Sequence, residues 1–348
     1  ENQIAPENAT VAPYDKENDF SKAAEAYSRF AMGPTATEED LVKYAFALFL
    51  NHDFEKSLEV ANMGLKKNAR HAAFNRLAMY NYTDLKRFDE AIKALDLNKN
   101  KIIVDGTAGG GGHSGEIAKT AKRVISIDQD PDAIEVLNER LGNKENVTIV
   151  HDNYSNIKNI VSNLNIDKID GLLLDLGVSS FQLDTAERGF SFHKDAPLDM
   201  RMSKSGLSAY DVVNNYDEKE LADIIYRYGE EKFSRRIAAN IVKSREEKPI
   251  ETTFELVDII KASMPQRAMR DSHPARKTFQ AIRIEVNAEL DVLKSTLEDA
   301  FEILAPGGRI AVITFHSLED RIVKEQFSKW CQGCTCPKEF PVCVCGNK

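Results

Sequence analysis

The sequence predicts an α/β fold, in which a doubly wound parallel sheet carries a helical insertion and follows an all-α repeat segment. From residue 102 onward, short apolar runs rich in Val, Ile and Leu alternate with helical patterns, which is typical of a parallel sheet covered by helices. Before that point the periodicity is helical, and one local pattern recurs every 34 residues. The longest unbroken apolar run, 44–50, has seven residues and is too short to cross a bilayer, so no membrane partner is expected.

Five apolar runs are expected to form the strands of the sheet: 102–104, 124–127, 147–150, 172–174 and 309–315. Helical patterns lie between the earlier runs, at about 113–120, 131–141 and 156–163. Residues 207–271 break the alternation with further helices, among them 218–228 and 231–244. One long helix is expected over about 278–304. The predicted divisions of the chain are therefore 1–96, 97–206, 207–271, 272–330 and 331–348.

The first 96 residues carry the repeat. Phe20, Phe54 and Phe88 are spaced by 34 residues. A small residue stands three positions after each of them: Ala23, Ser57 and Ala91. A small residue lets two helices approach closely while the aromatic ring fills the space beside it, so residues 15–96 resemble the tetratricopeptide repeat family. This resemblance implies a protein or peptide partner. An ordinary helical bundle that repeats by chance is the alternative.

A glycine-rich loop follows the first predicted strand and opens a helix. Gly110, Gly112 and Gly115 satisfy the GxGxxG pattern, in which glycine lets the backbone approach a ligand and the helix N-terminus offers N–H groups. The second strand ends at Asp128, whose carboxylate can accept two hydrogen bonds from a ribose diol. Together these features indicate a nucleoside cofactor, either NAD or S-adenosylmethionine. The alternative is a tight structural turn with a helix-capping aspartate.

Six longer motifs resemble the bacterial small-subunit rRNA methyltransferase H (MraW-type) family over about residues 97–346. They are 106–114, 175–184, 187–192, 197–202, 273–283 and 314–321. The resemblance implies a Rossmann-like S-adenosylmethionine methyltransferase core in a cytoplasmic enzyme. It implies methyl transfer to the N4 amine of a cytosine near the decoding centre, with 16S rRNA or the small ribosomal subunit as partner. By motif, the cofactor-binding residues would be Gly111, Gly112, His113, Asp128, Tyr154, Asp175 and Gln182.

Methylation of an exocyclic amine requires the nitrogen lone pair to face the sulfonium methyl, and an acceptor for the amine hydrogens. Asp175, at the end of the fourth predicted strand, is the first candidate for this base contact, and Asp199 is the second. The base must leave its stack, and Phe190 or Phe192 is a candidate to pack on it, although core packing is the commoner role of a Phe. His316 is expected to be a structural hydrogen-bonding residue rather than a substrate contact.

The formal net charge is −9, so RNA binding would depend on a local basic surface. Residues 262–284 carry five cations against the single acid Asp271. These candidate phosphate contacts are Arg267, Arg270, Arg276, Lys277 and Arg283. A solvated basic loop without an RNA partner is the alternative.

All five cysteines lie in the last 18 residues, which indicates a local feature in a reducing compartment rather than a disulfide framework. Four of them form two C-x-C pairs and are candidate zinc ligands: Cys334, Cys336, Cys343 and Cys345. Reduced cysteines that pack locally are the alternative.

Two other functions stay open. The chain lacks segments that usually flank the methyltransferase motifs, so it is a possible protein-interaction scaffold built on the repeats, with an inactive, truncated methyltransferase domain. An NAD-dependent oxidoreductase is supported by the GxGxxG pattern alone.

Overall fold

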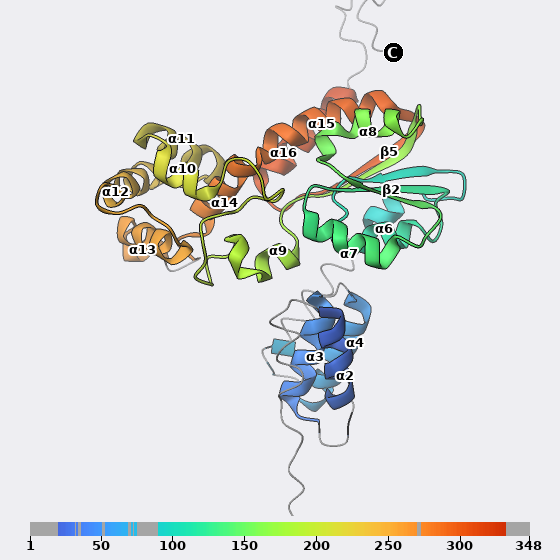
Figure 1. The fold of residues 1–348 in the computed structure, drawn as a ribbon, viewed down its shortest axis with the longest axis horizontal. Helices are drawn as coiled ribbons and strands as arrows, with labels where there is room; N and C mark the ends of the chain where they lie inside the picture. Colours follow the sequence, from blue (N-terminus) through green and yellow to red (C-terminus); the bar gives the residue numbers. More distant parts are fainter. Residues whose placement is uncertain are drawn as a thin grey trace, which may run out of the picture.

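The computed structural model describes residues 20–31, 33, 36–50, 53–68, 71, 73–74, 90–269 and 273–331. In its N-terminal part three helices pack against one another (Figure 1). They are α2 Phe20–Ala31, α3 Glu38–Leu50 and α4 Phe54–Lys67. Ala23 and Ser57, two of the small residues of the 34-residue pattern, are fully buried in their core, and the Ser57 hydroxyl donates to the Ala45 carbonyl oxygen at 2.7 Å. Phe88 lies outside the described residues, so the repeat family and its protein or peptide partner stay predictions.

The third small residue of the pattern packs elsewhere. Ala91 and Leu95 share a hydrophobic cluster with Ile103, Ile117 and Leu173 of the α/β part, and Leu95 is fully buried there. Residues 91–95 therefore pack with the sheet, although the sequence places them before the predicted boundary at 96/97.

Five parallel strands form the sheet, which confirms the predicted α/β architecture. Their order is β3-β2-β1-β4-β5. The bounds are β1 Ile102–Asp105, β2 Arg123–Asp128, β3 Val147–His151, β4 Ile169–Asp175 and β5 Leu304–Ile313. The strand order reverses direction between β1 and β4, and in open α/β sheets ligands bind at the carboxyl edge beside such a point.

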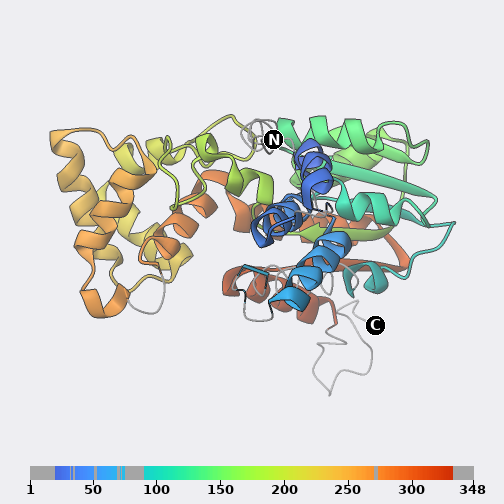
Figure 2. The ribbon, with the colours of Figure 1, turned by 90° about the horizontal axis from the view of Figure 1, so that it is seen from below.

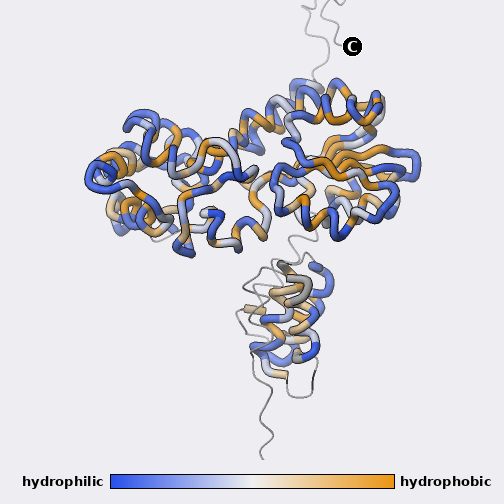
Figure 3. The backbone as a smooth tube through the Cα atoms, in the orientation of Figure 1, coloured by the Kyte–Doolittle hydropathy of each residue, from blue (hydrophilic) through white to orange (hydrophobic). Residues whose placement is uncertain are grey.

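Helices cover both faces of this sheet (Figures 1 and 2). One face packs against α6 Gly112–Ile117 and α7 Pro131–Leu141. The other packs against α8 Ile157–Asn163, α15 Glu289–Ile303 and α16 Ser317–Trp330. The strands are the most uniformly hydrophobic part of the chain in Figure 3, as expected for a parallel sheet buried on both faces.

A helical lobe extends from one end of the sheet (Figure 1). It contains α9 Ser180–Asp184, α10 Ala209–Asn215, α11 Glu218–Gly229, α12 Ser234–Glu247, α13 Thr253–Ser263 and α14 Arg276–Asn287. Its hydrophobic core includes Phe190 and Leu198 from before the predicted insertion, and Phe279 from after it. None of the helices in the described part of the chain combines the length and apolar composition that a membrane span requires.

The prediction of one long helix over 278–304 is wrong. The chain forms α14 and α15 instead, because Ala288 between them takes the left-handed conformation with φ +49°. The last strand also differs from its prediction, since β5 begins at Leu304 and ends at Ile313, which leaves Phe315 beyond the strand.

Candidate functional site

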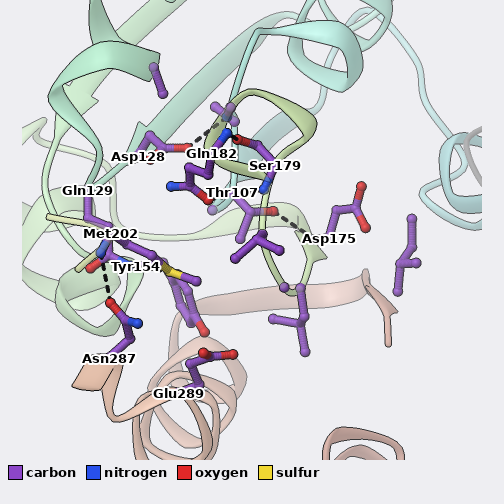
Figure 4. Close-up of a pocket in the computed structure, with 18 of the residues that line it drawn as sticks. Thr107, Asp128, Gln129, Tyr154, Asp175, Ser179, Gln182, Met202, Asn287 and Glu289 are labelled. Carbon is purple, nitrogen blue, oxygen red and sulfur yellow. Dashed lines mark hydrogen bonds between the residues drawn. The ribbon is translucent and has the colours of Figure 1, made fainter. Parts of the chain in front are cut away.

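A pocket of about 430 Å³ lies at the carboxyl edge of the sheet (Figure 4). Its walls come from the segments that follow all five strands, together with the junction of α14 and α15. This volume falls within the range of small-molecule sites. Of the predicted cofactor residues, six line it: Gly112, His113, Asp128, Tyr154, Asp175 and Gln182.

Gly111 does not line the pocket, which corrects its predicted role. It has φ +83°, and a Cβ atom placed there would lie 3.0 Å from Leu137 and 3.1 Å from Leu141 of α7. Glycine is therefore required at this position by backbone conformation and by helix packing.

The glycine loop is anchored from beneath by a buried chain of hydroxyl groups. The Ser126 hydroxyl contacts that of Ser114 at 2.7 Å, and Ser114 Oγ donates to Asp105 Oδ2 at 2.6 Å. Burial raises the pKa of the Asp105 carboxyl to about 6. These hydrogen bonds join β1, β2 and α6, so the glycine loop above them is held in place.

Asp128 holds the same loop from the end of β2. The Gly109 N–H donates to Asp128 Oδ2 at 2.7 Å, and the Asp130 N–H donates to Oδ1 at 2.8 Å. Burial raises the pKa of the Asp128 carboxyl to about 6. Each carboxylate oxygen has two acceptor sites, so the side chain can accept further hydrogen bonds from a ligand in the pocket.

Asp175 ends β4 on the other side of the strand-order reversal. Its N–H donates to Thr107 Oγ1 at 2.7 Å, which ties the end of β4 to the glycine loop. Its Oδ2 lies 3.8 Å from Nδ1 of His113. Burial lowers the pKa of His113 to about 4, so the imidazole is neutral at physiological pH.

Gln182 belongs to a buried polar network that sequence reasoning missed. Its Nε2 donates to Asp130 Oδ2 at 2.7 Å, and Arg188 Nη1 donates to the same oxygen at 2.8 Å. Arg188 Nη2 also donates to the carbonyl oxygens of Arg201 and Met202, each at 2.9 Å. The network fastens the segment after β4 to the end of β2. The motif 187–192 contains Arg188, but nothing in its local pattern indicates a buried guanidinium.

Residues after β2 and β3 form a further part of the lining. The Asn153 amide donates to Gln129 Oε1 at 2.7 Å, which joins the two strand ends. Tyr154 and Glu289 point toward each other across the pocket (Figure 4). The pKa of the Tyr154 hydroxyl is raised, first by burial and then by the negative charge of nearby Glu289. Tyr154 lines the pocket, and its predicted position near adenine stays a prediction.

The left-handed residue between α14 and α15 presents Asn287 to the pocket, a contribution that the sequence did not reveal. Asn287 Nδ2 donates to the Met200 carbonyl oxygen at 2.8 Å, and its Oδ1 accepts from the Met202 N–H at 2.9 Å. Met202 also lines the pocket (Figure 4). Asn287 therefore holds one loop of the helical lobe against the site.

Arg283 does not belong to the exposed basic surface that the sequence predicts. Its Nε and Nη2 donate to the two oxygens of Glu289 at 2.8 Å each, and its side chain is only 16% exposed. The bidentate pair neutralises the charge and lines the pocket. Arg283 lies near the C-terminal end of α14, where Glu289 of α15 pairs with it, while Arg276 and Lys277 at the start of the helix stay exposed. Arg267 is also exposed, and Arg270 lies outside the described residues.

The structure does not bring Asp199 to the pocket lining. Its carboxylate accepts hydrogen bonds from Nε, Nη2 and the backbone N–H of Arg201, at 2.6 to 3.2 Å. Phe190 is buried in the core of the helical lobe, and the Phe192 ring stacks on His273 with a centroid distance of 4.5 Å. Neither ring lines the pocket, so the structure gives both phenylalanines the packing role.

Three side chains form a cluster that resembles a metal site. Ligand atoms of Glu289, His316 and Glu319 lie within 4.8 Å of one another. Both oxygens of Glu289 already accept from Arg283, and Glu319 Oε2 accepts the N–H groups of Phe315 and His316. A guanidinium thus supplies the positive charge beside these carboxylates. The four cysteines predicted to bind zinc lie outside the described residues, so that site stays a prediction.

Comparison with known proteins finds close relatives. "Ribosomal RNA small subunit methyltransferase H" of Clostridium botulinum (strain Kyoto / Type A2) is 55% identical over 264 residues, which cover 75% of this chain and 85% of the relative. "Ribosomal RNA small subunit methyltransferase H 2" of Agathobacter rectalis is 55% identical over 267 residues, with the same coverage. A solved rRNA methylase from Streptococcus thermophilus aligns with a TM-score of 0.23 and 22% identity, over 31% of this chain and 65% of that one.

The family model described as "MraW methylase family" matches residues 86–348. The match begins ahead of residues 91–95, which pack against the sheet, and it takes in every segment that lines the pocket. The chain belongs to the MraW methylase family.

Proposed function

We propose that the chain transfers a methyl group from S-adenosylmethionine to the N4 amine of a cytosine in 16S rRNA, near the decoding centre. The observation that carries the proposal is one pocket in which the glycine loop and Asp128 face Asp175 across the strand-order reversal. The 55% identity to relatives named small-subunit rRNA methyltransferases supports the substrate class.

The residues present fit this cofactor. Asp128 has acceptor capacity for a ribose diol, and Gly112 and His113 line the loop side, where the methionine part would lie. Tyr154 supplies an aromatic surface for adenine. When bound, S-adenosylmethionine supplies an electrophilic methyl group.

Asp175 is the proposed contact for the amine. Its carboxylate is 31% exposed and lines the pocket, so it can accept a hydrogen bond from the N4 amine of a base placed there. Holding one amine hydrogen in this way aims the nitrogen lone pair across the pocket. Methyl transfer would leave the amine nitrogen positively charged, and Asp175 would take up that proton and pass it to solvent.

Other predicted residues act at a distance from this centre. Asp199 is proposed to position the loop at 199–202 through Arg201 rather than to touch the base. The exposed Arg267, Arg276 and Lys277 remain the proposed phosphate contacts. The scaffold and oxidoreductase alternatives are not favoured, because the matched region retains 55% identity to proteins named methyltransferases.

The proposal is tested by tritium transfer from labelled S-adenosylmethionine to 30S subunits and to free 16S rRNA, both from cells that lack the modification. We expect label in at least one substrate, recovered as N4-methylcytidine after digestion and mass spectrometry. Label in no RNA, or label in another nucleoside, would overturn the assignment.

The variant Asp175→Asn tests the proposed role of Asp175 as the acceptor of the amine hydrogen. It retains the size of the side chain but weakens the acceptor, so we expect kcat to fall about 100-fold, within the usual range for a proton-handling group. Asp199→Asn is the matched variant outside the pocket lining, and we expect a smaller loss. Calorimetry of cofactor binding shows whether either variant has lost the site itself.

A further inference from the structure

A large apolar side chain stands exposed at the mouth of the pocket without a role in the proposed function. The exposed large hydrophobic residues of the described chain are Phe46, Leu183, Leu207, Tyr210, Tyr226, Phe254, Phe301 and Phe315. Of these only Leu183 and Phe315 line the pocket. Phe315 is the sole aromatic of that pair, and it is 54% exposed. Since a buried Phe is worth about 1.5–3 kcal/mol relative to an exposed one, contact of a ligand with the exposed part of this side chain would be favourable.

The backbone of Phe315 is held firmly although its ring is exposed. Its N–H donates to Glu319 Oε2 at 2.8 Å, and the Glu319 side chain is only 2% exposed. Phe315 stands two residues beyond Ile313, which is the register partner of Asp175. The ring is thus carried on the segment that follows β5, next to the strand that ends at the proposed amine contact.

The backbone of Gly177, in the segment after β4, lies beside the Phe315 ring. A Cβ atom at position 177 would lie 3.4, 3.9 and 4.0 Å from Cδ2, Cγ and Cε2 of Phe315. Any larger side chain would therefore rest against the aromatic ring. Gly177 also has φ +102°, which favours glycine. The segment that follows Asp175 therefore turns at Gly177 and has no side chain at that position beside the Phe315 ring.

These observations define a flat apolar surface beside a hydrogen-bond acceptor. A pyrimidine turned out of its stack needs both: a ring to replace the lost stacking, and an acceptor that selects the amine edge. Stacking of one base on an aromatic side chain is worth about 1–3 kcal/mol and does not depend on the base identity. Selection of cytosine would then come from Asp175, and holding the base would come from the ring.

We infer that the Phe315 ring is the surface on which the target base stacks while its amine meets Asp175. The inference rests on the proposed function and adds a substrate-binding role to a residue after β5. Phe315 takes the base-packing role that the sequence had suggested for Phe190 or Phe192, both of which pack in the helical lobe.

The test compares Phe315→Leu with Phe315→Trp in the methyl-transfer assay, on whichever of 30S subunits or free 16S rRNA the wild type methylates. Leucine retains bulk but removes the aromatic face, so we expect KM for RNA to rise about 5- to 150-fold, the equivalent of 1–3 kcal/mol. Tryptophan retains the face and should keep KM within about threefold of wild type. The Kd for S-adenosylmethionine, measured by calorimetry, should not change in either variant.

Phe301→Leu is the matched control, because Phe301 is 51% exposed but lies outside the pocket lining. It should leave KM unchanged. If Phe315→Leu also leaves KM unchanged, or if Phe315→Trp is as impaired as Phe315→Leu, the stacking role is wrong while the proposed function stands. A wild-type enzyme that methylates neither substrate overturns the proposed function, and this inference with it.

Discussion

The loop wall of the pocket (residues 106–113 with Asp128) and its helix wall (residues 283–292) hold their polar groups differently. In the loop wall, backbone N–H groups donate to the carboxylate of Asp128. In the helix wall, side chains hold one another, as in the bidentate pair of Arg283 and Glu289. Backbone contacts of the first kind follow from a short stretch of glycines after a strand. Contacts of the second kind depend on which helix covers which strand, so a local motif does not encode them.

The helix wall gives the largest expected effect. Arg283→Met should lower the free energy of unfolding by about 3–5 kcal/mol, because it leaves the buried Glu289 carboxylate without its partner. Arg276→Met, at an exposed position on the same helix, should change it by less than about 0.5 kcal/mol. Urea unfolding measures both. The double variant Arg283→Met/Glu289→Leu should recover part of the loss. Equal effects of Arg283→Met and Arg276→Met on the free energy of unfolding would contradict the buried pair.

The buried carboxyl beneath the loop wall predicts a pH effect. The pKa of Asp105 is raised by burial from 3.8 to about 6 in the folded chain. A raised folded pKa means that the stabilising contribution is fully present below pH 4 and is lost as the pH rises through 6. Two pKa units correspond to about 3 kcal/mol. Asparagine does not titrate. We therefore expect the free energy of unfolding of Asp105→Asn to rise relative to that of wild type by up to about 3 kcal/mol between pH 4 and pH 7.

Denaturant unfolding of both proteins across that pH range is the measurement. The difference between variant and wild type isolates Asp105 from other titrating groups. A difference that stays constant with pH would show that Asp105 does not retain its proton in the fold.

The loop wall itself should control cofactor affinity. Asp128→Asn removes the charge that strengthens hydrogen bonds to a ribose, a loss of about 1.5–3 kcal/mol, so the Kd for S-adenosylmethionine should rise about 10- to 150-fold. Asp170→Asn is the matched control, because Asp170 accepts the Ile102 N–H at the opposite edge of the sheet, away from the pocket lining. Calorimetry should show little change for it. Similar Kd values for both variants would remove Asp128 from the site.

The smallest effect is expected from the exposed part of the basic stretch. Arg276→Gln should weaken RNA binding a few-fold and reduce the slope of log affinity against log salt by about 0.7–0.9, the value for one phosphate contact. Arg309→Gln removes an exposed cation in the middle of β5, where Arg309 pairs with Gly171 away from the pocket lining, and should leave the slope unchanged. Filter binding over a range of salt concentrations distinguishes the two.

Residues that act through the local chain were predicted well. The alternation of apolar runs predicts the parallel sheet, and strand-end positions predict Asp128 and Asp175 in the pocket. Gly111 was assigned to the ligand because a run of glycines does not show which member turns toward a neighbouring helix. Asn287 and Glu289 were missed because 278–304 has an uninterrupted helical pattern, and nothing in it marks Ala288 as the residue that turns left-handed.

The sequence alone determined the family motifs, the order of the five strands along the chain, and the carboxylates at the strand ends. These features depend on hydrophobic period and on residues within one turn or loop, which neighbours along the chain specify. Only the tertiary structure decided that Arg283 is a buried partner of Glu289, that Arg188 joins the ends of β2 and β4, and that the partly exposed Phe315 lines the pocket. Charge and apolar character do not reveal burial, because burial depends on which distant segment covers a side chain.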